Sequence, residues 1–204
     1  MPQIKNIIFD LGGVLLNIDY NKTAQAFQQL GVTNFDELYS QYKANPLFEE
    51  LETGKISEAA FYQAIEQYCR PATSQKDIEN AWNAMLLSFR TESLDFLVSL
   101  KDRYNLFLLS NTNSIHLKAF QQIFTTETGK ASLDNYFTKC YYSHIIQMRK
   151  PYMDVYQFVL QEGNMNAEET LFIDDSINNV NTAKELGMQV HHLLATEKIE
   201  DLQY

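Results

Sequence analysis

The residue with the clearest chemical potential is Asp10, which directly follows an apolar run. Ile7 to Phe9 form that run, and it has no polar face, as expected for a strand buried on both sides of a parallel sheet. Gly12 and Gly13 come next, so the backbone there can turn tightly and approach a ligand closely. A carboxylate at this place can attack phosphorus and form an aspartyl phosphate that water then hydrolyses. Asp10 is therefore a candidate nucleophile, and the alternative is an aspartate that only caps a turn.

A second group of residues could hold the negative charge of a phosphate. Ser110 and Asn111 follow the apolar run Leu106 to Leu109, where hydroxyl and backbone N–H groups form a ready anion site. Lys150 precedes Pro151, at which a helix can begin, but a lone lysine is ordinarily a solvated surface charge. We expect Ser110 and Asn111 to bind a phosphate, and the alternative at Ser110 is a helix cap.

A pair of acids suggests a metal site. Asp174 and Asp175 end another apolar run, and carboxylate and carbonyl oxygens are the ligands that Mg²⁺ prefers. A divalent cation would also remove the repulsion between Asp10 and a phosphate. We expect Asp10, the Gly12 carbonyl and Asp175 to supply the protein ligands, with Asp174 as a further ligand or a partner of one. The alternative is that the acids only cap the helix after Ser176.

The order of these groups along the chain is more specific than any one of them. This order resembles that of the haloacid dehalogenase-like hydrolases, and more narrowly their small-molecule phosphatases with a small helical cap. The motifs that carry the resemblance are IIFDLGG, LFLLSNTN, MRKP and LFIDDSINN. Through its place in MRKP, Lys150 is implied to neutralise the charge that builds on the transferring oxygens. The resemblance thus implies that Ser110, Asn111 and Lys150 bind substrate and that Ser110 and Lys150 also act in catalysis. The alternative for Lys150 is a solvated surface lysine.

The resemblance covers nearly the whole chain and implies both architecture and activity. It implies an α/β fold, a Rossmann-like parallel sheet with helices on both faces, plus an inserted all-helical cap. The core would comprise residues 1–16 and 91–204, and the cap residues 17–90. It also implies a magnesium-dependent phosphatase acting on a small phosphorylated metabolite, such as a sugar phosphate. In relatives with an acidic pair, the second acid is usually the direct metal ligand, which favours Asp175, and the turn Glu52 to Ser57 would dip towards the substrate.

The pattern of the chain agrees with this division. Strand and helix patterns alternate from residue 91 onward, which predicts a parallel sheet covered on both faces. Residues 34–88 read as helical, with Phe35, Leu38 and Tyr42 at helical spacing and no convincing strand. An earlier helix carries Ala24, Phe27 and Leu30, and Asp19 or Asn21 is placed to cap it.

One departure from the family pattern concerns the proton donor. Most phosphatases of the family carry a second Asp two residues after the nucleophile, and this chain has Gly12 there. A missing acid matters least when the leaving oxygen is already a good leaving group, as in a sugar 1-phosphate. We therefore expect sugar 1-phosphates to react faster than their 6-phosphate isomers, and relatives with Gly here include a sugar 1-phosphate phosphatase. The alternative is that Glu52 or a water held by the cap replaces the acid.

Composition narrows the class of protein and of partner. The chain has 204 residues and a net charge of -10, which argues against nucleic acid as the main partner. No apolar run approaches the ~20 residues of a membrane span, and the first residues lack a signal-peptide pattern. Cys69 and Cys140 stand in unrelated contexts, which favours a reducing compartment. We expect a cytoplasmic monomer or small homo-oligomer without a membrane or nucleic-acid partner.

Three other functions remain open at this point. A dehalogenase would use Asp10 on carbon without a metal, which leaves Asp174 and Asp175 unexplained, and that branch has an aromatic residue where Gly12 stands. A phosphomutase normally needs the acid that is missing at position 12. A catalytically weak protein that only binds a phosphometabolite would keep the phosphate site without turnover.

Four further residues are not expected to act in the reaction. His191 and His192 are consecutive on an expected strand, so their side chains point to opposite faces and do not form one metal site. His116 and Arg149 are expected at the surface.

Overall fold

The core of the protein is a parallel sheet of five strands in the order β7–β6–β1–β8–β9. The computed structural model describes residues 3–33, 35, 39–40, 43–44 and 46–203. The five strands are β1 (Asn6–Phe9), β6 (Asn105–Ser110), β7 (Lys139–Tyr142), β8 (Thr170–Asp174) and β9 (Gln189–His192). The central strand β1 pairs with β6 on one side and β8 on the other, so the ends of these three strands meet at one edge of the sheet.

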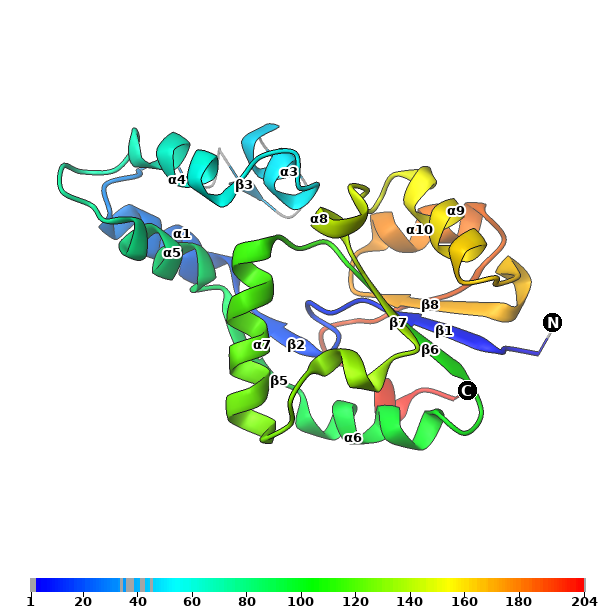
Figure 1. Ribbon diagram of the computed structural model, residues 1–204. Helices are drawn as coiled ribbons and strands as arrows, with labels where there is room; N and C mark the ends of the chain where they lie inside the picture. Colours follow the sequence, from blue (N-terminus) through cyan, green and yellow to red (C-terminus); the bar gives the residue numbers. More distant parts are fainter. Residues whose placement is uncertain (1–2, 34, 36–38, 41–42, 45, 204) are drawn as a thin grey trace.

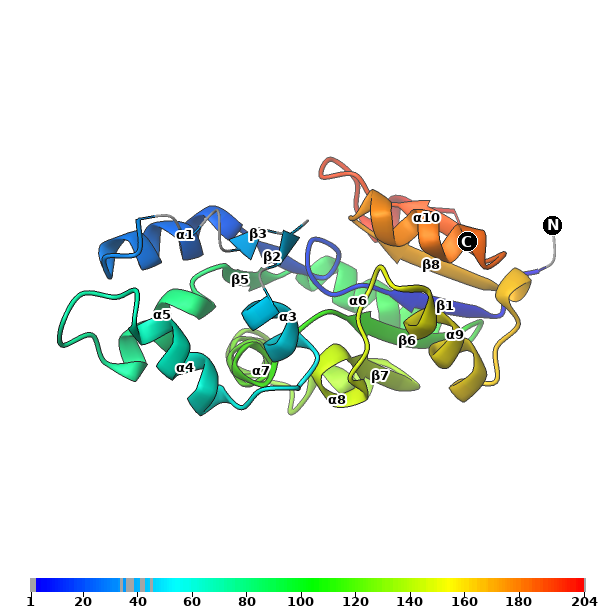
Figure 2. The same cartoon turned by 90° about the horizontal axis from the view of Figure 1, so that it is seen from above.

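Helices cover both faces of this sheet, as the sequence predicts (Figures 1 and 2). Because side chains alternate along a strand, Ile7 and Phe9 pack on one face and Ile8 on the other. The first face is covered by α6 (Thr91–Leu100) and α7 (Ser114–Thr128). The second face is covered by α9 (Met153–Glu162) and α10 (Ile177–Glu185). The expected α/β fold with a Rossmann-like parallel sheet is therefore confirmed.

Residues 17–90, here called the inserted segment, carry a hydrophobic cluster of their own. Its described helices are α1 (Tyr20–Gln29), α3 (Pro46–Glu52), α4 (Glu58–Glu66) and α5 (Gln75–Asn83), and they lie to one side of the sheet (Figure 2). The indole of Trp82 packs on Phe48 and Phe61, each with ring centroids 5.3 Å from it. Asp19 caps α1 by accepting a hydrogen bond from the Asn21 N–H at 3.0 Å, as expected.

The inserted segment is not purely helical, which corrects the prediction for residues 34–88. β5 (Leu86–Phe89) pairs antiparallel with β2 (Leu16–Ile18), and β3 (Tyr39–Ser40) pairs with β4 (Lys43–Ala44). The apolar run that continues the α5 pattern turns into β5 because the chain entering the segment offers a hydrogen-bonding partner. Leu38 and Tyr42 of the expected helical stripe lie outside the described residues.

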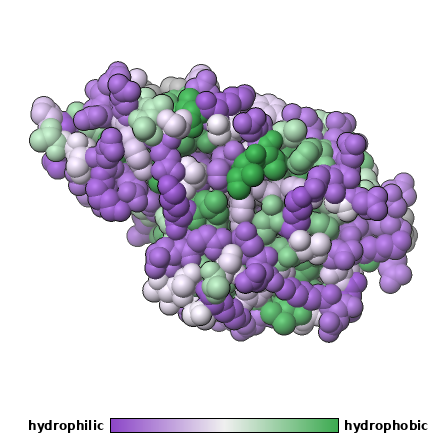
Figure 3. All heavy atoms as spheres, in the orientation of Figure 1, coloured by the Kyte–Doolittle hydropathy of each residue, from purple (hydrophilic) through white to green (hydrophobic). Residues whose placement is uncertain are grey.

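Short helices complete the chain. They are α8 (Ser143–Ile146) and the 3₁₀ helices Leu133–Tyr136, Ala167–Glu169 and Ile199–Asp201. Hydrophilic residues cover most of the face shown in Figure 3, with a hydrophobic patch near its middle. Among the described residues, no helix has the length and apolar character needed to span a membrane.

Candidate active site

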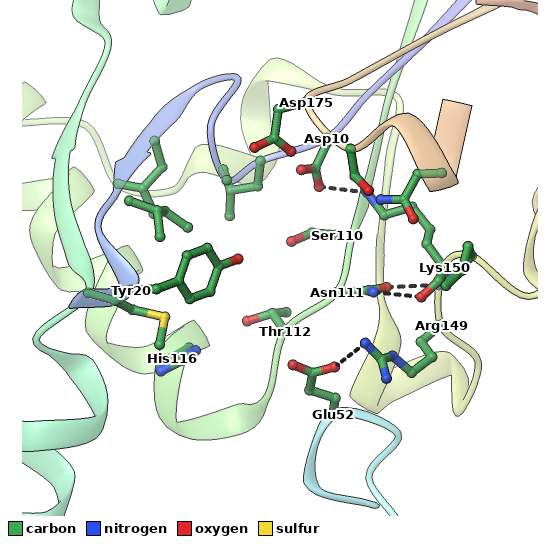
Figure 4. Close-up of a pocket in the computed structure, with 18 of the residues that line it drawn as sticks. Asp10, Tyr20, Glu52, Ser110, Asn111, Thr112, His116, Arg149, Lys150 and Asp175 are labelled. Carbon is green, nitrogen blue, oxygen red and sulfur yellow. Dashed lines mark hydrogen bonds and ion pairs between the residues drawn. The ribbon is translucent and has the colours of Figure 1, made fainter. Parts of the chain in front are cut away.

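A cavity of about 380 Å³ lies where the ends of β1, β6 and β8 face the inserted segment. The sheet contributes Asp10 and Ser110, the loop after β8 contributes Asp175, and the inserted segment contributes Tyr20 and Glu52 (Figure 4). The parallel register explains this convergence, since Phe9 of β1 stands level with Leu108 of β6 and Ile173 of β8. The motifs that the sequence places at strand ends are thereby brought to one site.

Lys150 is the centre of the buried end of the cavity. Its ammonium donates to Asp10 Oδ1 at 2.7 Å and to Asp174 Oδ2 at 2.6 Å. The residue is only 1% exposed, so the surface-lysine alternative is wrong. A buried cation of this kind needs both carboxylates to replace the water that it has lost.

The two acids at the end of β8 have different surroundings. Asp174 is fully buried, and its oxygens also accept hydrogen bonds from the Ser176 N–H at 2.8 Å and the Asn179 amide at 3.0 Å. Asp175 is only partly buried and lines the cavity. The contacts of Asp174 favour a positioning role for it and leave Asp175 facing a ligand.

The electrostatics of the acids show an excess of negative charge at this end. Burial raises the pKa of Asp10 to about 7, against the effect of the Lys150 charge, and Asp174 and Asp175 add to the rise. Burial and the Asp174 charge likewise raise the pKa of Asp175 to about 6. Burial opposes the charge of Lys150, but Asp10 and Asp174 outweigh it and raise the pKa of the ammonium.

This set of oxygens suits a magnesium ion. One oxygen each from Asp10, Asp174 and Asp175 can be chosen so that the three lie within 4.8 Å of one another. Hard oxygen ligands are the donor set that Mg²⁺ prefers, and one lysine does not balance three carboxylates. The residues present therefore fit a divalent cation beside Asp10.

The loop after β6 is organised around Lys150. The Asn111 side chain accepts from the Lys150 N–H at 2.9 Å and donates to the Lys150 carbonyl at 2.8 Å. Asn113, not Ser110, caps α7 by accepting from the N–H groups of Ile115 and His116. Ser110 is 3% exposed and lines the cavity. These contacts favour a positioning role for the Asn111 side chain and leave Ser110 available to a phosphate.

The glycines after Asp10 are explained by their neighbours. A Cβ on Gly13 would lie 2.3 Å from Asp175 Oδ2, and the residue has a left-handed φ of +72°, so a glycine is required there. A Cβ on Gly12 would lie 2.5 Å from Cδ1 of Ile18, which projects from β2. A side chain at position 12, where the family pattern has a second acid, would thus first meet the end of an apolar side chain.

The structure corrects the expectation that Arg149 is a surface residue. Its side chain is 13% exposed, and its guanidinium lies 3.1 Å from Glu52 and 3.6 Å from Glu49. All three residues line the cavity, and Glu52 and Arg149 lie at its end away from Asp10 (Figure 4). No pattern in the sequence pointed to Arg149 apart from its position beside Lys150.

His116 is buried, which corrects the expectation that it is exposed. Its ring stacks on Trp82 with centroids 4.6 Å apart, and Nε2 lies 3.1 Å from the Trp82 carbonyl. Because that carbonyl can only accept, we assign the proton to Nε2, and Nδ1 then accepts from the Asn113 amide at 3.2 Å. Burial lowers the pKa of His116 to about 4, so the ring is a neutral part of the cavity wall.

Sequence reasoning also missed Tyr20, whose hydroxyl points into the cavity (Figure 4). Burial, with the charges of Asp175 and Glu52, raises the pKa of this phenol, which therefore stays protonated. His191 and His192 do not share a site: His191 contacts Glu197 at 3.3 Å, and His192 contacts the Asp175 carbonyl at 3.0 Å.

Comparison with known proteins places this arrangement in a family. Residues 7–193 match the family model of haloacid dehalogenase-like hydrolases. The chain is 34% identical over 188 residues to D-ribitol-5-phosphate phosphatase of Bacteroides thetaiotaomicron, covering 92% of this chain and 90% of that protein.

Solved structures agree with the sequence comparison. An alanine variant of a haloacid dehalogenase family enzyme from Bacteroides thetaiotaomicron, in complex with magnesium and inorganic phosphate, superposes with a TM-score of 0.91 at 34% identity, covering 97% of this chain and 98% of that one. A predicted haloacid dehalogenase-like hydrolase from Porphyromonas gingivalis gives a TM-score of 0.86 at 34% identity, covering 96% and 94%. This chain belongs to the haloacid dehalogenase-like hydrolase family.

Proposed function

We propose that this protein is a magnesium-dependent phosphatase that hydrolyses a small phosphorylated metabolite, a sugar or sugar-alcohol phosphate, through an aspartyl phosphate on Asp10. The observation that carries the proposal is the buried contact of Lys150 with Asp10 and Asp174, beside the cavity-facing Asp175. The similarity to a ribitol 5-phosphate phosphatase, and to an enzyme solved with magnesium and phosphate, supports the same reaction.

In this mechanism an Asp10 carboxylate oxygen attacks phosphorus, and the bond from phosphorus to the leaving oxygen breaks. Ser110 donates a hydrogen bond to the phosphoryl group, and Lys150 neutralises the charge on its oxygens. Asp174 and Asn111 hold Lys150 in place. Water then hydrolyses the aspartyl phosphate and restores the Asp10 carboxylate.

A Mg²⁺ ion held by Asp10, Asp175 and the Gly12 carbonyl would remove the repulsion between the nucleophile and the phosphate. Asp174 fits better as the partner of Lys150 than as a direct ligand, because its oxygens already accept from Lys150, Ser176 and Asn179. We retain it in the candidate metal cluster because its carboxylate lies in the same group of oxygens.

The inserted segment, residues 17–90, is proposed as the cap domain over a core of residues 1–16 and 91–204. Its separate hydrophobic cluster supports this division, although Ile115 of α7 joins that cluster. A cytoplasmic setting, without nucleic acid or membrane as a partner, fits the net charge of -10 and the two free cysteines. The prediction of a monomer or small homo-oligomer remains.

The expected preference for sugar 1-phosphates also remains a prediction. The similar enzyme is named as a phosphatase of ribitol 5-phosphate. The phosphate of that compound is an ester of a primary alcohol, which is a poor leaving group. That similarity favours the alternative in which another cavity group or a water supplies the proton in place of Gly12.

The decisive experiment measures phosphate release by the purified protein. D-ribitol 5-phosphate, paired sugar phosphates and p-nitrophenyl phosphate are supplied, with Mg²⁺ or with excess chelator. We expect release with Mg²⁺ and its loss on chelation. If no compound releases phosphate with any divalent metal, the phosphatase proposal fails, and tight phosphate binding without turnover would then indicate a binding protein. Halide release that survives chelation would indicate a dehalogenase instead.

A further inference from the structure

The end of the cavity away from Asp10 has a charged lining that the phosphoryl-transfer chemistry does not use. Arg149 lies between Glu52 at 3.1 Å and Glu49 at 3.6 Å, and the Tyr152 hydroxyl donates to Glu49 at 3.3 Å. The side chain of Glu52 is only 8% exposed. We call Arg149, Glu52 and Glu49 the distal group.

Backbone contacts fix the distal group relative to Lys150, at the end of the cavity proposed to hold the phosphate. Arg149 and Lys150 are consecutive, and Asn111 binds the Lys150 backbone on both its N–H and its carbonyl. On the other side, a Cβ on Gly54 would lie 2.3 Å from the His144 carbonyl, so the turn after Glu52 packs directly on the core backbone. When the phosphate of a substrate lies at Lys150, its leaving group therefore faces the distal group.

The distal group offers both donors and acceptors. The Nε–H of Arg149 is buried without a hydrogen-bond partner among the residues that the structure describes. A buried unpaired donor is costly, so the hydrogen bonding of this guanidinium is incomplete among the described residues, and Arg149 lines the cavity. The carboxylate of Glu52 is an acceptor in the same wall of the cavity.

The charge balance of the distal group selects against anions. Among the side chains that the structure describes here, two carboxylates contact one guanidinium, which gives the distal group an excess of negative charge in a largely buried place. A carboxylate or second phosphate on the leaving group would add to this charge and would lose its hydration on entry. Uncharged hydroxyls can both donate and accept, and they bring no such cost.

We propose that Arg149 and Glu52 bind the hydroxyl groups of the leaving group and so select uncharged polyhydroxy phosphate monoesters over esters with an acidic leaving group. This inference rests on the proposed phosphatase function. The competing explanation is that the ion pair only fastens the inserted segment to the core, without touching the substrate.

The chain offers a matched control for that competing explanation. Lys118 of α7 contacts Glu58 of α4 at 2.8 Å, so this pair also joins the core to the inserted segment. It is exposed, and neither residue lines the cavity. Lys118→Ala therefore removes a comparable link without altering the distal group.

The test measures kcat/KM of the wild type, Glu52→Ala, Glu52→Gln, Arg149→Met and Lys118→Ala on three phosphates. These are D-ribitol 5-phosphate, p-nitrophenyl phosphate without hydroxyls, and phosphoglycolate with a carboxylate. We expect Glu52→Ala and Arg149→Met to lower kcat/KM on the ribitol ester by about 10- to 100-fold, the value of one or two charge-assisted hydrogen bonds. The loss on the aryl ester should be at least about tenfold smaller.

Glu52→Gln should raise the rate on phosphoglycolate relative to the ribitol ester, because it removes the excess charge but keeps an acceptor. Lys118→Ala should leave the ratios among the three substrates unchanged. Equal losses on all three substrates, in the variants of the distal group, would overturn the proposal in favour of a structural link. A wild type that prefers phosphoglycolate would overturn it too, whereas a wild type inactive on every phosphate would instead reject the phosphatase function.

Discussion

Each end of the cavity holds a cation paired with two carboxylates. The two cations, Lys150 and Arg149, are adjacent in the sequence, but they differ in burial and in their partners. Lys150 is 1% exposed and is held by two carboxylates at 2.7 and 2.6 Å. Arg149 is 13% exposed, and one of its two partners, Glu49, is one-third exposed. The phosphate end comes from the ends of three parallel strands and the loop at Lys150, whereas the distal end combines that loop with α3.

This difference separates the part of the reaction that every substrate shares from the part that differs between substrates. Every phosphate monoester presents the same group to Asp10 and Lys150, so these residues can be buried and tightly fixed. Leaving groups vary, and the distal group that we propose to meet them takes Glu49 and Glu52 from a segment with its own hydrophobic cluster. Changes at the phosphate end should therefore affect all substrates alike, and changes at the distal end should affect their ratios.

The largest effect is expected from Asp10→Asn. An amide cannot attack phosphorus, so turnover should fall by at least about 10³-fold on every phosphate, while the thermal unfolding temperature stays similar. Initial rates of phosphate release, with mass spectrometry to exclude deamidation, measure the effect. A variant that keeps most of the wild-type rate would show that Asp10 is not the nucleophile.

Lys150→Ala should follow, with a loss of about 10²–10³-fold in kcat on all substrates. Because it leaves Asp10 and Asp174 buried without their cation, it should also lower the free energy of unfolding by about 3–5 kcal/mol. Urea unfolding at neutral pH measures this, and Lys118→Ala, which breaks an exposed pair, serves as the control with at most about 1 kcal/mol. Equal stability of the two variants would contradict the buried role of Lys150.

The pH dependence of the metal-free protein tests the phosphate end alone. Burial raises the pKa of Asp10 to about 7 and that of Asp175 to about 6, above the usual aspartate range that an unfolded chain keeps. The folded protein therefore favours the protonated carboxyls. The stability that this preference adds at low pH is lost as the pH rises through 6 and 7.

Mg²⁺ should offset that loss, since it binds the ionised carboxylates. We expect the rise in melting temperature on adding Mg²⁺ to be larger at about pH 8 than at about pH 5, and the apparent affinity for Mg²⁺ to be at least about tenfold weaker at the lower pH. Calorimetry with and without the metal at both pH values measures this, and Asp175→Asn should remove most of the difference. Equal stabilisation at both pH values would argue against a metal bound by these acids.

The smallest effect is expected at Gly12, which lines the cavity close to Asp10 in the sequence. Because a Cβ there meets Cδ1 of Ile18, Gly12→Asp alone should gain little, and Gly12→Asp with Ile18→Ala should accept the new acid. If proton donation limits poor leaving groups, the double variant should favour glucose 6-phosphate over glucose 1-phosphate by a few-fold more than the wild type does.

The matching control is Ile18→Ala alone, because it opens the same space without supplying an acid. Equal rates of the wild type on the two glucose phosphates would reject the leaving-group argument. An unchanged isomer ratio in the double variant would show that another group already donates the proton.

The sequence by itself determined the sheet and the phosphate end. Strands buried on both faces read as continuous apolar runs, and in a parallel sheet their carboxyl ends must meet. The residues that follow three of these runs, Asp10, Ser110 and Asp175, therefore had to line one site. The five core strands and the helices α6, α7, α9 and α10 were predictable for the same reason, because their pattern is local and periodic.

Only the tertiary structure decided the distal end. Arg149 and Glu52 lie far apart in the sequence, and no periodicity predicts that a helix of the inserted segment packs against the loop before Lys150. His116 was misplaced because its burial depends on Trp82 of another helix, and β5 was missed because its partner β2 lies at the opposite end of the inserted segment. The position of Ile18 beside Gly12 was also not predictable from the sequence. Contacts of this kind depend on side-chain packing between distant segments, and the local pattern of residues does not predict such packing.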